Sequence, residues 1–375
     1  MKRIICIMLG TALLSASLAA CNGGGDQAPA ATPPPASATA TPAPANPAVT
    51  SEVTSSGPDF SGAPRVNLVF STYMPDTDPT TLDMLHYLDI VNEYTEGTVE
   101  YTLHAAQSLV AGNEGLDAVR AGLCDLAFFA TGYGSGSLPL CYMLEYPGVL
   151  YESHKALAYT IKEWFEVVRP PEISDVKLLF ALGQGGGVFA TTIPLRVYED
   201  FAGKQIRTTA SLIPVIEAYG AFPTFMVIGE VYEALRTGVI QGHHGIANAV
   251  YTFNIHEVTD YILMDPFYLF SGELFLNMDV WNSLTEDQQA AIEAAGEDAF
   301  DAFLSAGREK EVSAAIEEFR KAGLEINSFS DEDYAKMAAA NGPLQEAYAA
   351  GVEGGPEALA LLRETAAKYN ALYPG

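Results

Sequence analysis

A twelve-residue pattern occurs twice in the sequence, at Glu114–Asp125 (EGLDAVRAGLCD) and at Glu230–Gln241 (EVYEALRTGVIQ). Each copy begins with Glu and carries Ala, Arg and Gly four, six and eight residues later. The pattern predicts a short helix that ends at Gly122 or Gly238, where glycine adopts the left-handed conformation, followed by a strand. The separation of 116 residues is too long for a solenoid repeat. We therefore predict two similar lobes with a cleft between them.

The start of the folded region alternates strand and helix patterns. RVNLVFSTYM (65–74) alternates apolar and polar residues as strands do, DPTTLDMLHYLDIVNEYTEG (78–97) has helical spacing, and TVEYTLHA (98–105) resembles a second strand. Such alternation is typical of an α/β fold with a largely parallel sheet. The glycine-rich stretch 183–187 lacks the Lys-Ser/Thr of a phosphate-binding loop, so we interpret it as a crossover between the lobes.

Helix-start signals mark the C-terminal part of the chain. Thr285 and Gln288 have the spacing of a capping box, and Ser330 precedes another helical pattern. We predict helices after both positions and assign no chemistry to them.

The N-terminus has the pattern of an export signal. Residues 1–20 carry two cations and then a short apolar run, and they end in small residues before Cys21. The Leu-Ala-Ala-Cys ending resembles a bacterial lipobox, which predicts cleavage before Cys21 and lipidation of its thiol. An ordinary signal cleaved after Ala20 is the alternative. Residues 21–64 are rich in Ala, Pro and Thr and predict a disordered tether, so the folded part would work outside the cytoplasm beside a membrane.

The charge excludes some partners. The chain has 19 Lys and Arg against 47 Asp and Glu, a net charge of -28. A nucleic-acid partner is not expected, because phosphate backbones require a cationic surface. The state of Cys124 and Cys141, which could form a disulfide in an oxidising compartment, stays open.

Arg207, in the stretch FAGKQIRTTAS (201–211), is the main candidate for ligand binding. A guanidinium is planar and permanently charged, so a single arginine in a cleft can hold a carboxylate through two parallel hydrogen bonds. The alternative is a surface arginine that offsets the acidic excess.

His243 and His244 suggest a metal site at first sight. In an extended segment their side chains point to opposite faces, and no Cys or acid stands nearby at ligand spacing, so we predict no metal and no other cofactor. One of them could donate a hydrogen bond to a ligand, or be a loop histidine bonded to backbone. We find no catalytic motif and predict that the protein is not an enzyme.

The sequence resembles the solute receptors of TRAP transporters, the DctP family. The resemblance rests on GKQIRTT (203–209), AYGAFPTFMVIGEVYEALRTGVIQGHHG (218–245), LTEDQQAAIEAA (284–295) and SLVAGNEGLDAVRAGLCDLAFF (108–129), and it covers 65–368. It implies a two-lobed periplasmic-binding-protein-like fold with crossing segments and a ligand cleft. It also implies TRAP permease membrane subunits as partners.

The resemblance implies that Arg207 pairs with the carboxylate of a small organic acid. Many relatives carry a second arginine where this chain has Gly187, and Gln-Glu-Asn where it has His243, His244 and Gly245. We therefore expect a monocarboxylate with a bulkier or less polar remainder, and neither a dicarboxylate nor a sialic acid. The residues that we expect in the cleft are Tyr73, Thr131, Tyr133, Gln184, Gly187, Arg207, Ile228, His243, His244 and Asn248.

The expected boundaries follow from these assignments. Lobe I takes residues 65–184 and 272–311, lobe II takes 185–271 and 312–345, and 346–375 form a C-terminal helical segment. The leading function is uptake of an organic acid by a lipid-anchored receptor on the outer face of the cell membrane. The alternatives are a lipoprotein that signals to a membrane kinase and, less favoured, a metal-dependent enzyme.

Overall fold

The computed structural model describes residues 58–134, 136–305 and 307–375. The predicted signal peptide, Cys21 and most of the predicted tether lie outside these residues. The expected tether boundary at residue 64 is too late, because Phe60 is buried and the Asp59 amide donates to Asp287 Oδ2 at 3.1 Å. The folded part therefore includes residues before Arg65.

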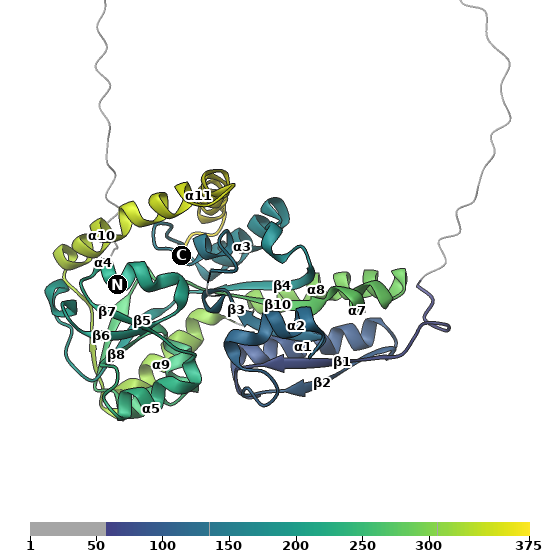
Figure 1. The fold of residues 1–375 in the computed structure, drawn as a ribbon, viewed down its shortest axis with the longest axis horizontal. Helices are drawn as coiled ribbons and strands as arrows, with labels where there is room; N and C mark the ends of the chain where they lie inside the picture. Colours follow the sequence, from purple (N-terminus) through teal and green to yellow (C-terminus); the bar gives the residue numbers. More distant parts are fainter. Residues whose placement is uncertain (1–57, 135, 306) are drawn as a thin grey trace, which may run out of the picture. The chain divides into compact units, whose positions relative to one another are not determined.

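Two mixed sheets organise the described residues (Figure 1). Sheet A has the strand order β2-β1-β3-β10-β4, and sheet B has the order β11-β9-β5-β8-β6-β7. The strands of sheet A are β1 (Val66–Thr72), β2 (Val99–His104), β3 (Leu126–Ala130), β4 (Val176–Gln184) and β10 (Phe270–Asn277). Those of sheet B are β5 (Gly187–Thr191), β6 (Gln205–Thr208), β7 (Phe222–Phe225), β8 (Gly242–Ile246), β9 (Tyr261–Asp265) and β11 (Glu325–Asn327). We call the parts built on sheets A and B lobe I and lobe II.

The two sheets share one pairing pattern. In lobe I, β1 is parallel to β2 and β3, while β10 is antiparallel to β3 and β4. In lobe II, β6 is parallel to β7 and β8, while β5 is antiparallel to β8 and β9. In sheet B the edge strand β11 is also parallel to β9, so parallel pairs lie at both ends of that sheet. The predicted two-lobed α/β fold is confirmed, with mixed sheets.

The sequence repeat occupies the same place in each lobe. Helix α2 (Gly115–Ala121) leads to the central strand β3, and α5 (Val231–Arg236) leads to β8. A left-handed glycine follows each helix, Gly122 directly with φ 69° and Gly238 after the cap residue Thr237 with φ 76°. The predicted helix ends are therefore correct, and each repeat delivers a strand to the middle of a sheet.

The chain crosses between the lobes three times. It passes from β4 to β5 through Gly185 and Gly186, returns from β9 to β10 through 266–269, and passes again from α8 (Glu286–Ser305) to α9 (Arg308–Ala322). Gly186 has φ 80°, and a Cβ there would lie 2.7 Å from Val312 Cγ2. This crossing therefore needs glycine for both conformation and space.

The remaining helices cover the two sheets. They are α1 (Pro79–Tyr94), α3 (His154–Val168), α4 (Ile213–Ala218), α6 (Ala247–Thr252), α7 (Met278–Ser283), α10 (Asp331–Ala350) and α11 (Gly355–Leu372). The predicted capping signals are present, since Thr285 and Gln288 exchange hydrogen bonds and Ser330 accepts from the Asp333 amide. None of the helices in the described part of the chain has the length and apolar character required to cross a bilayer.

The C-terminal helices contact both lobes. Helix α10 packs against α4 of lobe II, and α11 packs along α3 of lobe I, as Figure 1 shows near the top of the molecule. The fully buried Trp164 of α3 donates its indole N–H to the Ala358 carbonyl at 3.0 Å. The expected boundary between 345 and 346 falls inside α10, which continues without a break to Ala350.

Candidate functional site

A cavity of about 40 Å³ lies between the lobes. The lining residues from lobe I are Tyr73, Met74, Asp78, Pro79, Thr80, Ala130, Tyr133, Gln184 and Phe270. Those from the segment 185–269 include Arg207, Thr209, Ile228, His243, Gly245, Asn248, Phe253 and Tyr268. Because the walls come from both lobes, motion of one lobe against the other would change the size of this cavity.

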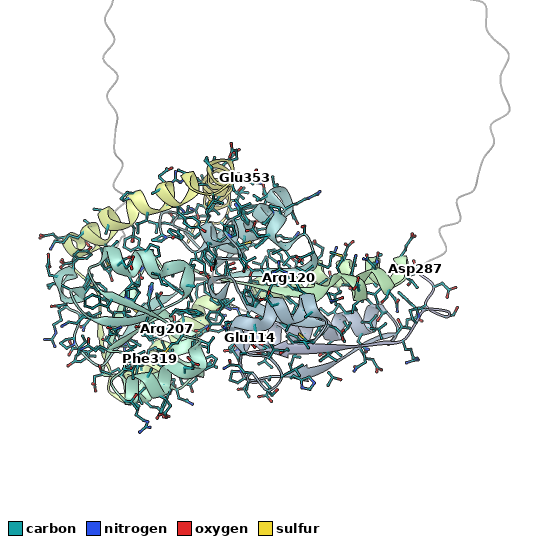
Figure 2. All side chains as sticks on the ribbon, in the orientation of Figure 1. Glu114, Arg120, Arg207, Asp287, Phe319 and Glu353 are labelled. Carbon is teal, nitrogen blue, oxygen red and sulfur yellow. The ribbon has the colours of Figure 1, made fainter. Side chains whose placement is uncertain are left out.

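Arg207 is buried in the wall formed by lobe II, with 2% of its surface exposed (Figure 2). It lies on β6, opposite His243 in the register with β8. Its Nε donates to the Met226 carbonyl at 2.9 Å, and Nη2 donates to the Tyr133 hydroxyl at 3.3 Å. Its Nη1 lies 3.5 Å from both the carbonyl of His244 and Nδ1 of His243. These contacts fix the guanidinium plane.

Arg207 makes no ion pair within 4.0 Å among residues 58–375 as far as the structure describes them. The other arginines that are buried or half-buried in the described part of the chain, Arg120 and Arg308, each pair with a carboxylate. Burial raises the pKa of the Glu145 carboxyl to about 7, although the positive charge of Arg207 acts to lower it. A buried cation without a paired anion is costly. The cavity is therefore electrostatically suited to an anion.

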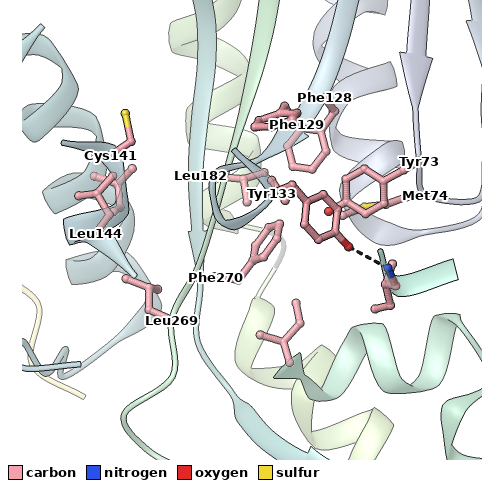
Figure 3. Packing of buried hydrophobic residues seen from close by; sticks show 14 of the residues in the cluster. Tyr73, Met74, Phe128, Phe129, Tyr133, Cys141, Leu144, Leu182, Leu269 and Phe270 are labelled. Atoms are coloured by element: carbon pink, nitrogen blue, oxygen red, sulfur yellow. Dashed lines mark hydrogen bonds between the residues drawn. The ribbon is translucent and has the colours of Figure 1, made fainter. Parts of the chain in front are cut away.

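Aromatic rings form the wall contributed by lobe I. The ring centroids of Tyr73 and Tyr133 are 5.3 Å apart (Figure 3). The ring centroids of the neighbouring Phe128 and Phe270 are 6.5 Å apart. The Tyr133 hydroxyl also accepts a hydrogen bond from the Ile228 amide at 3.0 Å, the dashed line in Figure 3. Burial raises the pKa of Tyr133 in spite of the neighbouring Arg207, so its hydroxyl keeps its proton.

His243 and His244 point to opposite faces of β8. His243 lines the cavity, and its pKa is lowered well below the ordinary value by burial and by the charge of Arg207. His244 lies outside the cavity, where its ring stacks on Phe189 with centroids 4.2 Å apart and its Nε2 lies 2.8 Å from Asp265 Oδ2. The strand alternation thus separates the two rings, and they do not converge on one point.

Seven of the residues expected in the cleft line this cavity, namely Tyr73, Tyr133, Gln184, Arg207, Ile228, His243 and Asn248. Three do not. His244 faces Asp265, as described above. The Thr131 hydroxyl donates to the buried Glu273 carboxylate at 2.6 Å and is turned into lobe I. Gly187 is covered by Tyr268, whose Cβ would lie 2.3 Å from a Cβ at position 187.

The sequence did not indicate several residues of the cavity. Tyr268 and Phe270 belong to the second crossing and the start of β10, and Asp78 and Thr80 lie at the start of α1. Asp78 caps α1 through its hydrogen bond from the Thr80 amide at 2.8 Å. The sequence Asp78-Pro79 is typical of a helix start. That this helix start lies at the cavity depends on how the two lobes pack together.

The comparisons with known proteins agree with this architecture. Residues 70–351 match the family model DctP, bacterial extracellular solute-binding protein, family 7. A solute-binding protein of Sulfitobacter sp. strain NAS-14.1 is 29% identical over 185 residues, which are 48% of this chain and 54% of that protein. The chain thus spans about half the length of that relative.

Two further proteins extend the match. The C4-dicarboxylate-binding periplasmic protein DctP of Rhodobacter capsulatus is 23% identical over 266 residues, 70% of this chain and 79% of that protein. A TRAP solute-binding protein from a marine metagenome, specific for aromatic acid ligands and solved with metahydroxyphenylacetate, has a TM-score of 0.75 at 21% identity. It covers 82% of this chain and 100% of its own. The chain therefore belongs to the DctP family, the bacterial extracellular solute-binding proteins of family 7.

Proposed function

We propose that this receptor closes on a small monocarboxylic acid with an apolar or aromatic remainder and delivers it to TRAP permease subunits for ion-gradient-driven uptake. The observation that carries the proposal is Arg207, a buried arginine in the interlobe cavity without an acidic partner within ion-pair distance among the described residues. A ligand carboxylate would supply that partner through charge-assisted hydrogen bonds from the guanidinium.

The charges of the cavity support one carboxylate and not two. Arg207 is the single Lys or Arg among the described residues that line it. The family resemblance places a second arginine of many relatives at the position of Gly187, and here Tyr268 covers that position. The carboxyl of Asp78 also lines the cavity and would repel a second anionic group.

The walls support an apolar or aromatic remainder. Tyr73, Tyr133, Phe253, Tyr268 and Phe270 all line the cavity, and aromatic pairs favour offset or edge-to-face contacts with a further ring. The marine metagenome protein, which shares the fold, is specific for aromatic acid ligands. This agreement supports the ligand class that the walls of the cavity favour.

The size of the cavity implies movement. Its volume of about 40 Å³ is far below the roughly 150 Å³ of an engineered protein cavity that binds benzene. An aromatic acid therefore requires the lobes to open for entry and to close less tightly around it. Opening would break the hydrogen bond from the Ile228 amide of lobe II to the Tyr133 hydroxyl of lobe I.

The proposal includes anchoring by lipid at Cys21, so that the tether keeps the receptor near its permease. The ligand class is tested by a thermal-shift screen of monocarboxylates, dicarboxylates, sugars and amines. A ligand at 100 times its Kd should add about 2.7 kcal/mol to the free energy of unfolding. Stabilisation by aromatic or apolar monocarboxylates supports the proposal. Stabilisation by sugars or amines alone contradicts it.

A further inference from the structure

We infer that the cavity selects acids that carry a hydroxyl group, and that His243 and Asn248 are the residues that recognise it. This inference rests on the proposed function, since it concerns the part of the ligand that Arg207 does not hold. Both residues line the cavity, and each has a buried polar side-chain atom with no hydrogen-bond partner among the described residues, Nε2 of His243 and Oδ1 of Asn248.

The surroundings of His243 determine which ring nitrogen carries the proton. Arg207 has only N–H donors, so the contact of 3.5 Å between its Nη1 and Nδ1 of His243 requires Nδ1 to be the acceptor. Burial beside a permanent positive charge also disfavours a doubly protonated ring. The proton of the neutral ring therefore lies on Nε2, which makes this atom a hydrogen-bond donor.

Gly245 leaves the space that Nε2 of His243 occupies. A Cβ at position 245 would lie 2.5 Å from this nitrogen, so a side chain there would displace the ring. Gly245 lines the cavity together with His243, two residues before it on the same strand. Because position 245 has no side chain, the His243 ring keeps its place and Nε2 is not covered by residue 245.

The orientation of the Asn248 amide is fixed from the other side. Its Nδ2 donates to Oε2 of Glu311 at 3.1 Å, and the same carboxylate oxygen accepts from Nη1 of Arg308 at 2.6 Å. An ionised carboxylate only accepts, so the amide nitrogen must face Glu311. Oδ1 of Asn248 is therefore left as an unpaired acceptor.

The cavity thus holds one unpaired donor and one unpaired acceptor in addition to the Arg207 guanidinium. A hydroxyl group can meet either atom, because it both accepts and donates. An acid without such a group leaves both buried atoms unpaired, and sites built to bind a hydroxyl reject analogues that lack it. We expect the hydroxylated acid to bind at least about tenfold more tightly than its parent.

Calorimetry with phenylacetate, 3-hydroxyphenylacetate and mandelate tests the inference, because the three acids differ only in a hydroxyl group. The wild-type protein should bind at least one hydroxylated acid at least about tenfold more tightly than phenylacetate. His243→Phe and Asn248→Leu remove the donor and the acceptor, and at least one of them should reduce that ratio to less than about threefold. His256→Phe is the matched control, because His256 lies in lobe II outside the cavity and contacts the Val250 carbonyl.

Two results would overturn the inference. One is equal binding of the three acids by the wild-type protein, as expected when a bound water molecule satisfies both atoms in every complex. The other is a hydroxyl preference that survives both substitutions in folded variants. Equal binding would leave the proposed function intact, whereas wild-type protein that binds none of the three acids would contradict the aromatic-acid form of the proposed function.

Discussion

The hydroxyl oxygen of Tyr133 accepts a hydrogen bond from Nη2 of Arg207 at 3.3 Å, and so connects lobe I to the guanidinium of lobe II. The same oxygen accepts from the Ile228 amide. Tyr133 therefore contacts Arg207 and links the two lobes through its hydroxyl group.

Replacing Tyr133 by Phe removes these two hydrogen bonds and keeps the ring. We expect ligand affinity to fall about tenfold, because a hydrogen bond to a charged group contributes about 1.5–3 kcal/mol. Calorimetry with the tightest-binding acid measures the change. Tyr101→Phe is the control, since the Tyr101 hydroxyl donates to Asp89 and neither residue lines the cavity. Equal affinities of the two variants would remove Tyr133 from the binding mechanism.

Gly187→Ala should lower the midpoint of thermal unfolding. The added Cβ would lie 2.3 Å from Tyr268 Cβ and 2.7 Å from the Asp265 carbonyl oxygen, and overpacking of this kind costs about 1–3 kcal/mol. Gly185→Ala is the matched control in the same crossing, because a Cβ at position 185 meets nothing within 4 Å. Equal unfolding midpoints of the two variants would show that position 187 has room for a side chain.

The stability of the protein should fall as the pH rises from about 4.5 to about 8. Burial raises the pKa of Glu145 to about 7 and that of Glu273 to about 8, against the hydrogen bonds that each receives. In this range the unfolded chain releases these protons before the folded protein does, so rising pH favours unfolding. Above the raised values both states are ionised and this contribution stops changing.

Thermal unfolding between pH 5 and 8 measures this effect. Glu145→Gln and Glu273→Gln should each flatten the pH dependence, because an amide does not titrate. Glu286→Gln, at an exposed position in the first turn of α8, serves as the control. A pH dependence unchanged in both buried variants would show that these carboxyls do not account for it.

Local signals in the sequence were sufficient to predict the helix ends, and long-range packing decided much of the cavity. Gly122 and Gly238 end their helices because the left-handed conformation depends on a few neighbouring residues. The prediction that His243 and His244 point to opposite faces followed from the strand period, but which of them faces the ligand depends on how sheet B packs. Thr131 was expected in the cavity, yet its hydroxyl finds Glu273 on β10, far away in the sequence.

The contact of Tyr268 with Gly187 could not be predicted from the sequence either. Tyr268 arrives from the second crossing, and nothing in the pattern around residue 268 indicates that its ring lies over β5. The role expected for Arg207 came from the family resemblance, because a surface arginine was the alternative that the residues alone left open. That Arg207 has no ion-pair partner among the described residues is a property of the folded lobes.

The central claim is that Arg207 holds the ligand carboxylate, and calorimetry on Arg207→Ala tests it most directly. Loss of the guanidinium would leave the carboxylate of the bound ligand buried and unpaired. The Kd of the tightest-binding acid should therefore rise at least about 100-fold in Arg207→Ala, and Arg207→Lys should recover part of this affinity. Arg236→Ala is the control, because Arg236 is exposed and pairs with Glu233 on the surface of lobe II, where such pairs contribute less than about 1 kcal/mol. A Kd for folded Arg207→Ala within about fivefold of the wild-type value, like that of the control, would contradict the account.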